Sequence, residues 1–367
     1  MKKALTILSA AVLLLATGCN KNPFSLKGSE ISFGSSAEKM ATRTEYGATN
    51  TAGTKQAIDW VVGDIVRIIS PEAAVTGNGS NLHWADYTVS SVTKNEDATS
   101  AALVNTNPNG LAWTDAETYS FYSVYPASAG LSLEDATYAQ VSANFLQAEP
   151  ALPTSTTTKT VGEGESAITY TVYTPDIKNA VLTAAVSGVK ESNEKPQVQL
   201  HFKPTWTAIE FNLSCKDAEP VEITQIQLVA EEPDLLVAPF TMTAGADLST
   251  ITVGTTGTSN TVTLNTTTGS DGITLTETQG ATFTMLLLPK KNTKTLKFRV
   301  TSKEGDSTKT SVVSLTKNGN TFELEPGKLY RINGFKVPGN YWRIFYAPDI
   351  LDVDAWEELG ETSIIVE

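Results

Sequence analysis

Apolar and polar residues alternate along many short segments of this chain, and this period of two is the feature that most limits its possible folds. Val198, Leu200 and Phe202 alternate with polar residues, and the apolar residues of 209–213 and 296–300 do the same. Successive side chains of a β-strand point to opposite faces of a sheet, so the pattern predicts strands with one apolar and one polar face. No stretch keeps a helical repeat over three turns. We therefore predict an all-β protein.

Two local features add detail to this prediction. The apolar residues change parity between Ile223 and Ile226, so we expect a β-bulge near Gln225 that returns both side chains to the core. The segment Pro153–Ser166 lacks the charge of a disordered tract, and we interpret it as a surface connection or an edge hairpin.

The composition agrees with a surface-exposed β protein and excludes several classes of function. The 367 residues include 52 threonines, which suit strands better than helix interiors. Acidic residues outnumber basic ones 40 to 27, for a net charge of −13, and such a chain repels nucleic-acid backbones. Two cysteines and two histidines are too few for zinc fingers, iron–sulfur clusters or a disulfide framework.

The N-terminus has the pattern of an export signal. Two lysines precede the apolar stretch Ala4–Ala16, which is too short to span a bilayer. The following Thr17, Gly18 and Cys19 are similar to the end of a bacterial lipoprotein signal. We predict a signal peptide at residues 1–18, lipidation of Cys19 and a tether at 19–28; the alternative is a plain signal peptide with a coincidental cysteine. A lipidated chain would be anchored to a membrane without spanning it.

No motif in the sequence predicts catalysis. Glycine-rich phosphate loops and a Gly-x-Ser-x-Gly nucleophile turn are absent. His83 and His201 lie 118 positions apart in strand-like runs and are interpreted as surface residues. We therefore predict no enzyme activity, no catalytic residue, no metal and no cofactor. The six tryptophans could pack in a core or stack on sugars, and core packing is favoured for each: Trp60, Trp84, Trp113, Trp206, Trp342 and Trp356.

The polar segment Lys216–Pro220 interrupts two strand-like runs and is interpreted as a boundary between domains. It predicts an N-terminal β-sandwich domain at 29–216 and a C-terminal one at 217–367, each of ordinary domain size.

Several segments in order along the chain resemble the fimbrillin family, the type V pilins of Bacteroidales. After the lipoprotein-like signal come a Phe-containing strand and a Thr-Arg-Thr segment, and then the landmarks of the two domains. These landmarks are Ile31–Phe33, Thr42–Thr44, the Trp-x-x-Gly-Asp segment Ile58–Val66, the aromatic run Tyr119–Pro126, the paired-strand segment Leu200–Phe211, Leu286–Pro289 and Pro326–Tyr330.

The resemblance implies two tandem transthyretin-like antiparallel β-sandwiches in a cell-surface fimbrial subunit of the outer membrane. It also implies assembly with other subunits by strand exchange, in which a protease cuts after an N-terminal arginine and the first strand leaves. Arg43 is the residue that matches; Arg67 lies in an apolar run and is expected to be buried. The donor strand would be Ile364, Ile365 and Val366, or else Tyr341–Tyr346.

A different reading of the same sequence is a surface glycan-binding lipoprotein of a polysaccharide-uptake system. It requires exposed tryptophan and tyrosine side chains as a binding platform. The position of these rings in the fold therefore separates the two hypotheses.

Overall fold

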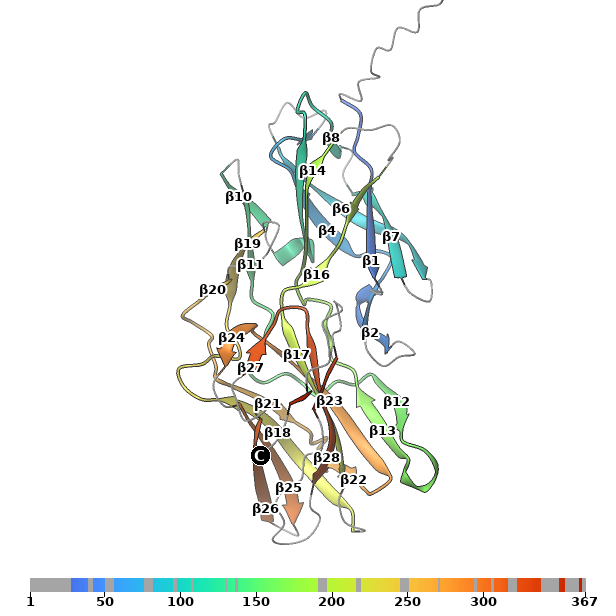
Figure 1. Ribbon diagram of the computed structural model, residues 1–367, viewed down its shortest axis with the longest axis vertical. Helices are drawn as coiled ribbons and strands as arrows, with labels where there is room; N and C mark the ends of the chain where they lie inside the picture. Colours follow the sequence, from blue (N-terminus) through green and yellow to red (C-terminus); the bar gives the residue numbers. More distant parts are fainter. Residues whose placement is uncertain are drawn as a thin grey trace, which may run out of the picture.

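The computed structural model (Figure 1) describes most of the chain after the predicted tether. The described residues are 28–38, 42–49, 56–75, 82–94, 98–106, 109–129, 131–135, 138–190, 197–215, 219–244, 251–269, 271–293, 296–304, 307–315, 322–337, 350–353 and 363–364. Within these ranges the regular structure consists of strands and two short 3-10 turns, which confirms the all-β prediction. No helix in the same ranges has the length and apolar character needed to cross a membrane.

The upper half of Figure 1 is built on an eight-stranded sheet. In spatial order its strands are β15 (Val198–Leu200), β1 (Phe33–Glu38), β7 (Ala98–Asn105), β6 (Trp84–Lys94), β4 (Ile65–Ile69), β9 (Tyr119–Tyr125), β14 (Leu182–Val189) and β16 (Lys203–Pro204). All these pairs are antiparallel except β1 with β15, which run parallel.

The lower half of Figure 1 contains two further sheets, which pack on each other. A seven-stranded sheet has the order β12 (Thr156–Val161), β13 (Ile168–Tyr173), β23 (Gln279–Leu287), β17 (Thr207–Cys215), β28 (Leu329–Val337), β29 (Ile350–Val353) and β30 (Ser363–Ile364). A five-stranded sheet contains β21 (Thr261–Asn265), β18 (Val221–Ala230), β25 (Leu296–Glu304) and β26 (Ser307–Leu315), with β22 (Ile273–Leu275) also paired to β18. The two sheets pack face to face, because Phe211 of β17 stacks on Phe298 of β25 with ring centroids 3.9 Å apart.

Smaller sheets complete the described chain. A four-stranded sheet has the order β10 (Leu131–Asp135), β11 (Tyr138–Ala143), β19 (Phe240–Ala244) and β20 (Ile251–Val253). Three strand pairs are β2 (Thr42–Thr49) with β3 (Gln56–Trp60), β24 (Lys290–Thr293) with β27 (Phe322–Leu324), and β5 (Ala74–Val75) with β8 (Leu111–Ala112).

The two local expectations from the sequence are confirmed. The pairing of β18 with β25 shifts register between Ile223 and Gln225, and Ile223 and Ile226 are both fully buried. One extra residue on β18 is therefore what keeps its apolar residues on the core side. Within Pro153–Ser166, β12 is the edge strand of the seven-stranded sheet and forms a hairpin with β13.

The Trp-x-x-Gly-Asp segment forms a tight turn between β3 and β4. Gly63 has φ +102°, a conformation that side chains with a Cβ rarely adopt. The Asp64 carboxylate accepts hydrogen bonds from the Val61 amide at 3.0 Å and from the Tyr125 hydroxyl at 3.3 Å. The ring of Trp60 meets the ring of Tyr125 edge to face at 5.4 Å. The turn is thus bound to the aromatic strand β9.

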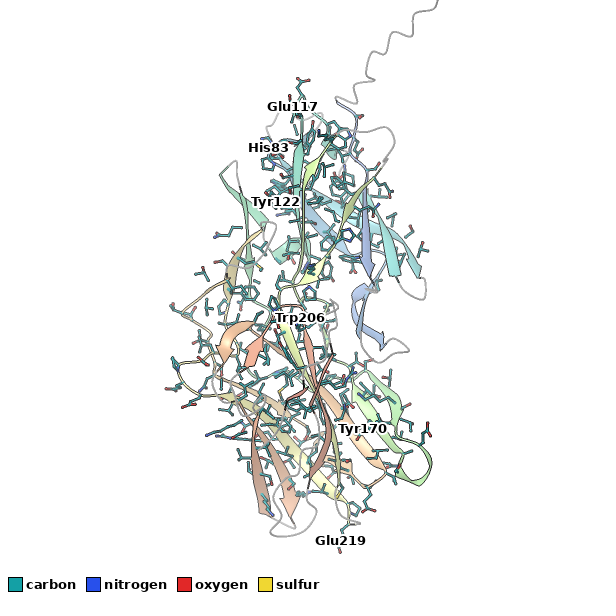
Figure 2. The ribbon with its side chains drawn as sticks, in the orientation of Figure 1. His83, Glu117, Tyr122, Tyr170, Trp206 and Glu219 are labelled. Atoms are coloured by element: carbon teal, nitrogen blue, oxygen red, sulfur yellow. The ribbon has the colours of Figure 1, made fainter. Side chains whose placement is uncertain are left out.

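Residues 203–207 connect the upper and lower sheets. β16 pairs with β14 of the eight-stranded sheet, and β17 follows almost at once in the seven-stranded sheet. Trp206 lies at this junction (Figure 2), fully buried, and its carbonyl oxygen accepts the Gly327 amide at 2.7 Å. The division at 216/217 stays a prediction, and the pairings interleave the two parts: β11 pairs with β19, and β13 pairs with β23.

Candidate functional site

The first described strand, β1, lies inside the eight-stranded sheet. It runs between β15 on one side and β7 on the other, with Phe33 opposite both Val198 and Leu103. β1 is the ladder partner that joins β15 to the rest of this sheet. We call the position that β1 occupies, between Val198–Leu200 and Ala98–Asn105, the β1 groove.

The inward side chains of this segment are apolar or small and completely enclosed. Ile31, Phe33 and Ser35 are each 1% exposed, while Ser32 between them is exposed. The Phe33 ring meets Tyr87 at 5.0 Å and Phe121 at 5.2 Å, both edge to face. Such contacts stabilise by burial of apolar area and by ring geometry, without any ionic bond.

Backbone hydrogen bonds hold the start of the segment. The Ile31 amide donates to the Leu111 carbonyl at 2.8 Å, and the Trp113 amide donates to the Ser29 carbonyl at 3.1 Å. Below them, the Tyr87 hydroxyl oxygen accepts the Leu111 amide at 2.9 Å. Burial raises the pKa of Tyr87, so the phenol stays protonated. The site consists of backbone pairing over an apolar floor, an arrangement that suits the binding of an extended strand.

Arg43 lies in β2, five residues after the end of β1. The pairing of β2 with β3 shifts register between Thr42 and Glu45, so Arg43 and Thr44 occupy a bulge. Residues in a bulge leave the regular ladder. This backbone is therefore less constrained by pairing than the strand interiors of the larger sheets.

Arg67 differs from Arg43 in its surroundings. Its guanidinium donates to Asp86 through Nε at 2.7 Å and Nη2 at 3.0 Å, and it lies 4.1 Å from the centre of the Trp84 ring. Arg67 was expected to be buried, but it is only partly buried: its side chain lies on the outer face of β4 and is 24% exposed. Because Val66 and Ile68 take the inward positions of β4, the side chain of Arg67 lies on the other face, where the Asp86 carboxylate and the Trp84 ring contact it.

The remaining predicted site residues are only partly within the described chain. Cys19, Ile365 and Val366 lie outside the described residues, as does Tyr341–Tyr346. Ile364 belongs to β30, where it pairs with Ile350 of β29.

Core packing is confirmed for three of the six tryptophans. Trp60, Trp113 and Trp206 are 4%, 8% and 0% exposed, and Trp84 is half-buried beneath Arg67. Trp342 and Trp356 lie outside the described residues. The four described rings therefore do not form the exposed platform that the glycan-binding hypothesis requires.

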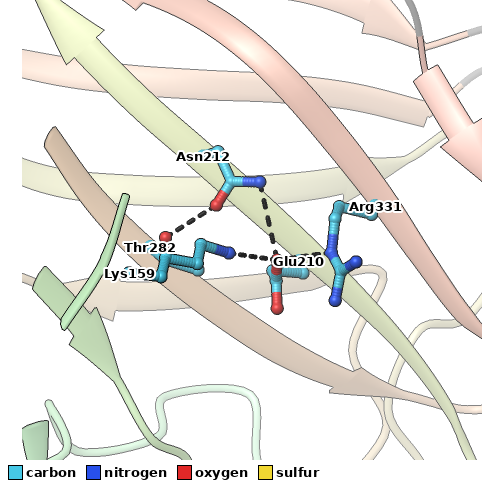
Figure 3. Close-up of polar contacts among 5 residues, drawn as sticks. All are labelled: Lys159, Glu210, Asn212, Thr282 and Arg331. Atoms are coloured by element: carbon cyan, nitrogen blue, oxygen red, sulfur yellow. Dashed lines mark hydrogen bonds and ion pairs between the residues drawn. The ribbon is translucent and has the colours of Figure 1, made fainter. Parts of the chain in front are cut away.

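The sequence pattern missed an ionic cluster around the buried Glu210 of β17, which pairs with Lys159 of β12 and Arg331 of β28 (Figure 3). Glu210 Oε1 accepts Lys159 Nζ at 2.7 Å and Arg331 Nε at 2.7 Å. Burial by itself raises the pKa of Glu210, but Arg331 and Lys159 outweigh it and hold the pKa below its usual value. Burial lowers the pKa of Lys159. The Glu210 carboxylate is thus ionised, and the cations of Lys159 and Arg331 compensate its negative charge.

The alternation along 209–213 predicts that Glu210 and Asn212 face solvent, and this is wrong. They are 3% and 2% exposed, and Thr282 Oγ1 donates to Asn212 Oδ1 at 2.6 Å. The polar face of β17 is covered because the β12–β13 hairpin brings Lys159 over it. Among the described residues, no group of three or more metal-ligating side chains comes together.

No family model matches the chain, and no curated protein matches it. Among solved structures, the chain is similar to a provisionally assigned cell adhesion protein of Bacteroides ovatus, at 14% identity and a TM-score of 0.47, covering 90% of this chain and 99% of that one. A provisionally assigned cell adhesion protein of Bacteroides uniformis has 13% identity and a TM-score of 0.44, with 92% and 97% covered. A fimbrial assembly protein of Parabacteroides distasonis has 10% identity and a TM-score of 0.38, with 92% and 99% covered. These three solved structures are of Bacteroides and Parabacteroides proteins described as cell adhesion or fimbrial assembly proteins.

Proposed function

We propose that this protein is a structural or accessory subunit of cell-surface fimbriae that serves cell adhesion and has no enzyme activity. The chain is anchored in the outer membrane through a lipid on Cys19. It polymerises when proteolysis releases β1 and a strand of another subunit takes its place. The observation that carries the proposal is the position of β1, an N-terminal strand inserted between β15 and β7 with Ile31 and Phe33 buried.

The energetics favour replacement of β1 over an empty groove. Loss of β1 removes the ladder partner of β15, frees one edge of β7, and exposes Tyr87 and Phe121 where Phe33 had covered them. An open edge above an apolar groove binds an extended strand through main-chain hydrogen bonds and side-chain pockets. The incoming strand need only supply apolar side chains at alternate positions, because the contacts that Phe33 makes with Tyr87 and Phe121 are between rings and involve no charge.

Arg43 is the proposed cleavage point because it follows β1 directly and lies in the β2 bulge. The donor is the C-terminal segment Ile364–Val366 or Tyr341–Tyr346. Since Ile364 pairs with Ile350 in β29, donation of the first of these requires that β30 unpairs from β29. β30 is a two-residue edge strand, so few ladder bonds oppose this step.

The test is digestion of the full chain with an arginine-specific protease, followed by electrophoresis of unboiled samples. We expect one early cut after Arg43, loss of the N-terminal fragment and SDS-resistant oligomers. Arg43→Ala is the matched control, because it leaves Arg67 available and should stay monomeric.

A synthetic peptide of residues 29–43 in excess should compete for the groove and suppress the oligomers. The same peptide with Phe33→Ala should suppress them less. If the cut chain retains its fragment and stays monomeric, strand exchange is rejected; if the wild-type peptide has no effect, the β1 groove is not the exchange site.

A further inference from the structure

The described chain contains a cavity of about 720 Å³ whose lining residues include none from the β1 groove. It opens between the four-stranded sheet and the beginning of β14, and strands β11, β19 and β20 contribute to its wall. Its floor is apolar: Ala143, Leu146, Val181 and Phe240 are buried. The half-buried Phe145 ring lies 6.3 Å from Phe240, edge to face. A volume of this size is typical of sites for small molecules.

The rim of the cavity carries hydroxyl and amide groups. Six of them come from exposed or half-buried residues: Ser128, Ser142, Asn144, Gln147, Asn179 and Thr241. No residue that lines this cavity is ionisable, although the chain as a whole has 40 acidic and 27 basic residues. An ionised ligand would lose hydration here without gaining an opposite charge, which is unfavourable.

A second cavity of about 300 Å³ adjoins the first, because both are lined by Phe145, Leu146, Gln147 and Asn179. It contains an aromatic wall in which Tyr173 stacks on Phe283, with centroids 5.0 Å apart and planes 13° from parallel. Its one charged residue is Asp176, whose carboxylate pairs with Lys178 Nζ at 2.9 Å. The two cavities form one trough whose accessible groups are the half-buried rings of Phe145 and Tyr173, together with amides and hydroxyls.

We propose that this trough binds a neutral oligosaccharide. A sugar ring has an apolar C–H face that packs on aromatic and aliphatic surfaces, and a periphery of hydroxyls that both donate and accept hydrogen bonds. Asn, Gln, Ser and Thr side chains are the groups that can do both in return. The absence of charge in the larger cavity selects neutral sugars against uronic or sialic acids. The proposal is independent of strand exchange, since no residue of the trough belongs to β1, β7 or β15.

The experiment titrates the full chain with neutral oligosaccharides (maltohexaose, cellohexaose, xylohexaose and N-acetyllactosamine) and with the anionic hexagalacturonate. Saturation-transfer NMR detects weak binding and calorimetry gives the Kd. We expect at least one neutral probe to bind with micromolar to millimolar Kd, and hexagalacturonate not to bind.

Two variants assign any binding to the trough. Asn179→Ala removes a donor and acceptor from the wall that both cavities share, and should weaken binding about tenfold. Thr252→Trp, on the exposed edge strand β20, should block the larger cavity and abolish binding. Asn265→Ala, an exposed amide of the five-stranded sheet, is the matched control and should bind as wild type. Urea unfolding of each variant separates loss of binding from loss of the fold.

The proposal is overturned if no neutral probe binds at millimolar concentration, if hexagalacturonate binds equally well, or if both trough variants bind as the wild type does. Because the strand-exchange assay uses none of these residues, failure of either proposal leaves the other intact.

Discussion

β1 and β17 have neighbours of the same two kinds in their sheets and are held there by different forces. Each lies between one parallel and one antiparallel neighbour: β1 between β15 and β7, and β17 between β28 and β23. The parallel neighbour of β1 is a three-residue edge strand, whereas both neighbours of β17 are nine residues long. β1 is enclosed by aromatic rings around Phe33, whereas β17 also carries the buried Glu210 with two cations.

Under the proposed strand exchange, this difference explains why β1 rather than β17 would be the strand that is replaced. Apolar contacts are non-directional, so another strand with apolar residues at alternate positions can satisfy the β1 groove. A buried carboxylate needs its own cations in place, and any other strand or register at β17 would leave charges uncompensated. These contacts support the proposal of strand exchange at β1, while the ionic contacts of β17 favour a single arrangement of the lower sheet.

The largest expected effect is the loss of the carboxylate at β17. Glu210→Gln leaves the buried Arg331 and the partly exposed Lys159 beside a neutral amide and should lower the free energy of unfolding by about 4 kcal/mol. Urea denaturation measures this change. Lys178→Ala removes a cation from the exposed pair with Asp176 and is the control, with an expected change below about 0.5 kcal/mol after screening by solvent. Equal losses in both variants would contradict the role assigned to Glu210.

The next effect concerns Phe33. Phe33→Ala should cost about 3 kcal/mol, because it removes a fully buried ring and its contacts with Tyr87 and Phe121. It should also speed the release of the N-terminal fragment after cleavage at Arg43, since β1 would bind its groove less tightly. Val104→Ala on the exposed face of β7 is the control and should change neither quantity. An unchanged release rate in Phe33→Ala would show that another contact limits the departure of β1.

The smallest effect appears on acidification. The pKa of Glu210 in the folded chain lies below its usual value of 4.5, so the unfolded chain takes up this proton first as the pH falls. The stabilisation by the ionic cluster is therefore complete above pH 4.5 and is lost as the pH falls through the folded pKa. The difference between the urea midpoints of wild type and Glu210→Gln should narrow as the pH is lowered from 7. A constant difference between the two would mean that Glu210 does not titrate with unfolding.

Local sequence patterns predicted much of the fold because they report on local forces. The period of two, the β18 bulge and the edge hairpin around β12 depend on residues within a few positions of one another. The aromatic strand β9 and the Trp-x-x-Gly-Asp turn were recognisable for the same reason. The candidate site was predicted in part: the Phe-containing segment was expected as a strand, and Phe33 begins β1, but the strands that flank β1 were not predicted. Cleavage after Arg43 stays a prediction.

The prediction from the sequence was wrong for the polar face of β17, which is covered by segments that are distant in the sequence. Glu210 was expected at the surface, because alternation tells which residues share a face and says nothing about what covers that face. Lys159 and Arg331 come from 51 positions before and 121 positions after it. The parallel pairs β1–β15, β13–β23 and β17–β28 were likewise unexpected, since the two strands of a parallel pair are far apart in sequence.

By itself, then, the amino-acid sequence determined that this chain forms many short strands with one apolar face each, since strand formation and burial follow from local alternation. Only the tertiary structure decided which strands became neighbours, that Ile31 and Phe33 fill a groove between β15 and β7, and that the polar side of β17 is closed by an ionic cluster. Pairing and coverage depend on segments brought together from across the chain, and no local pattern records which segment will meet which.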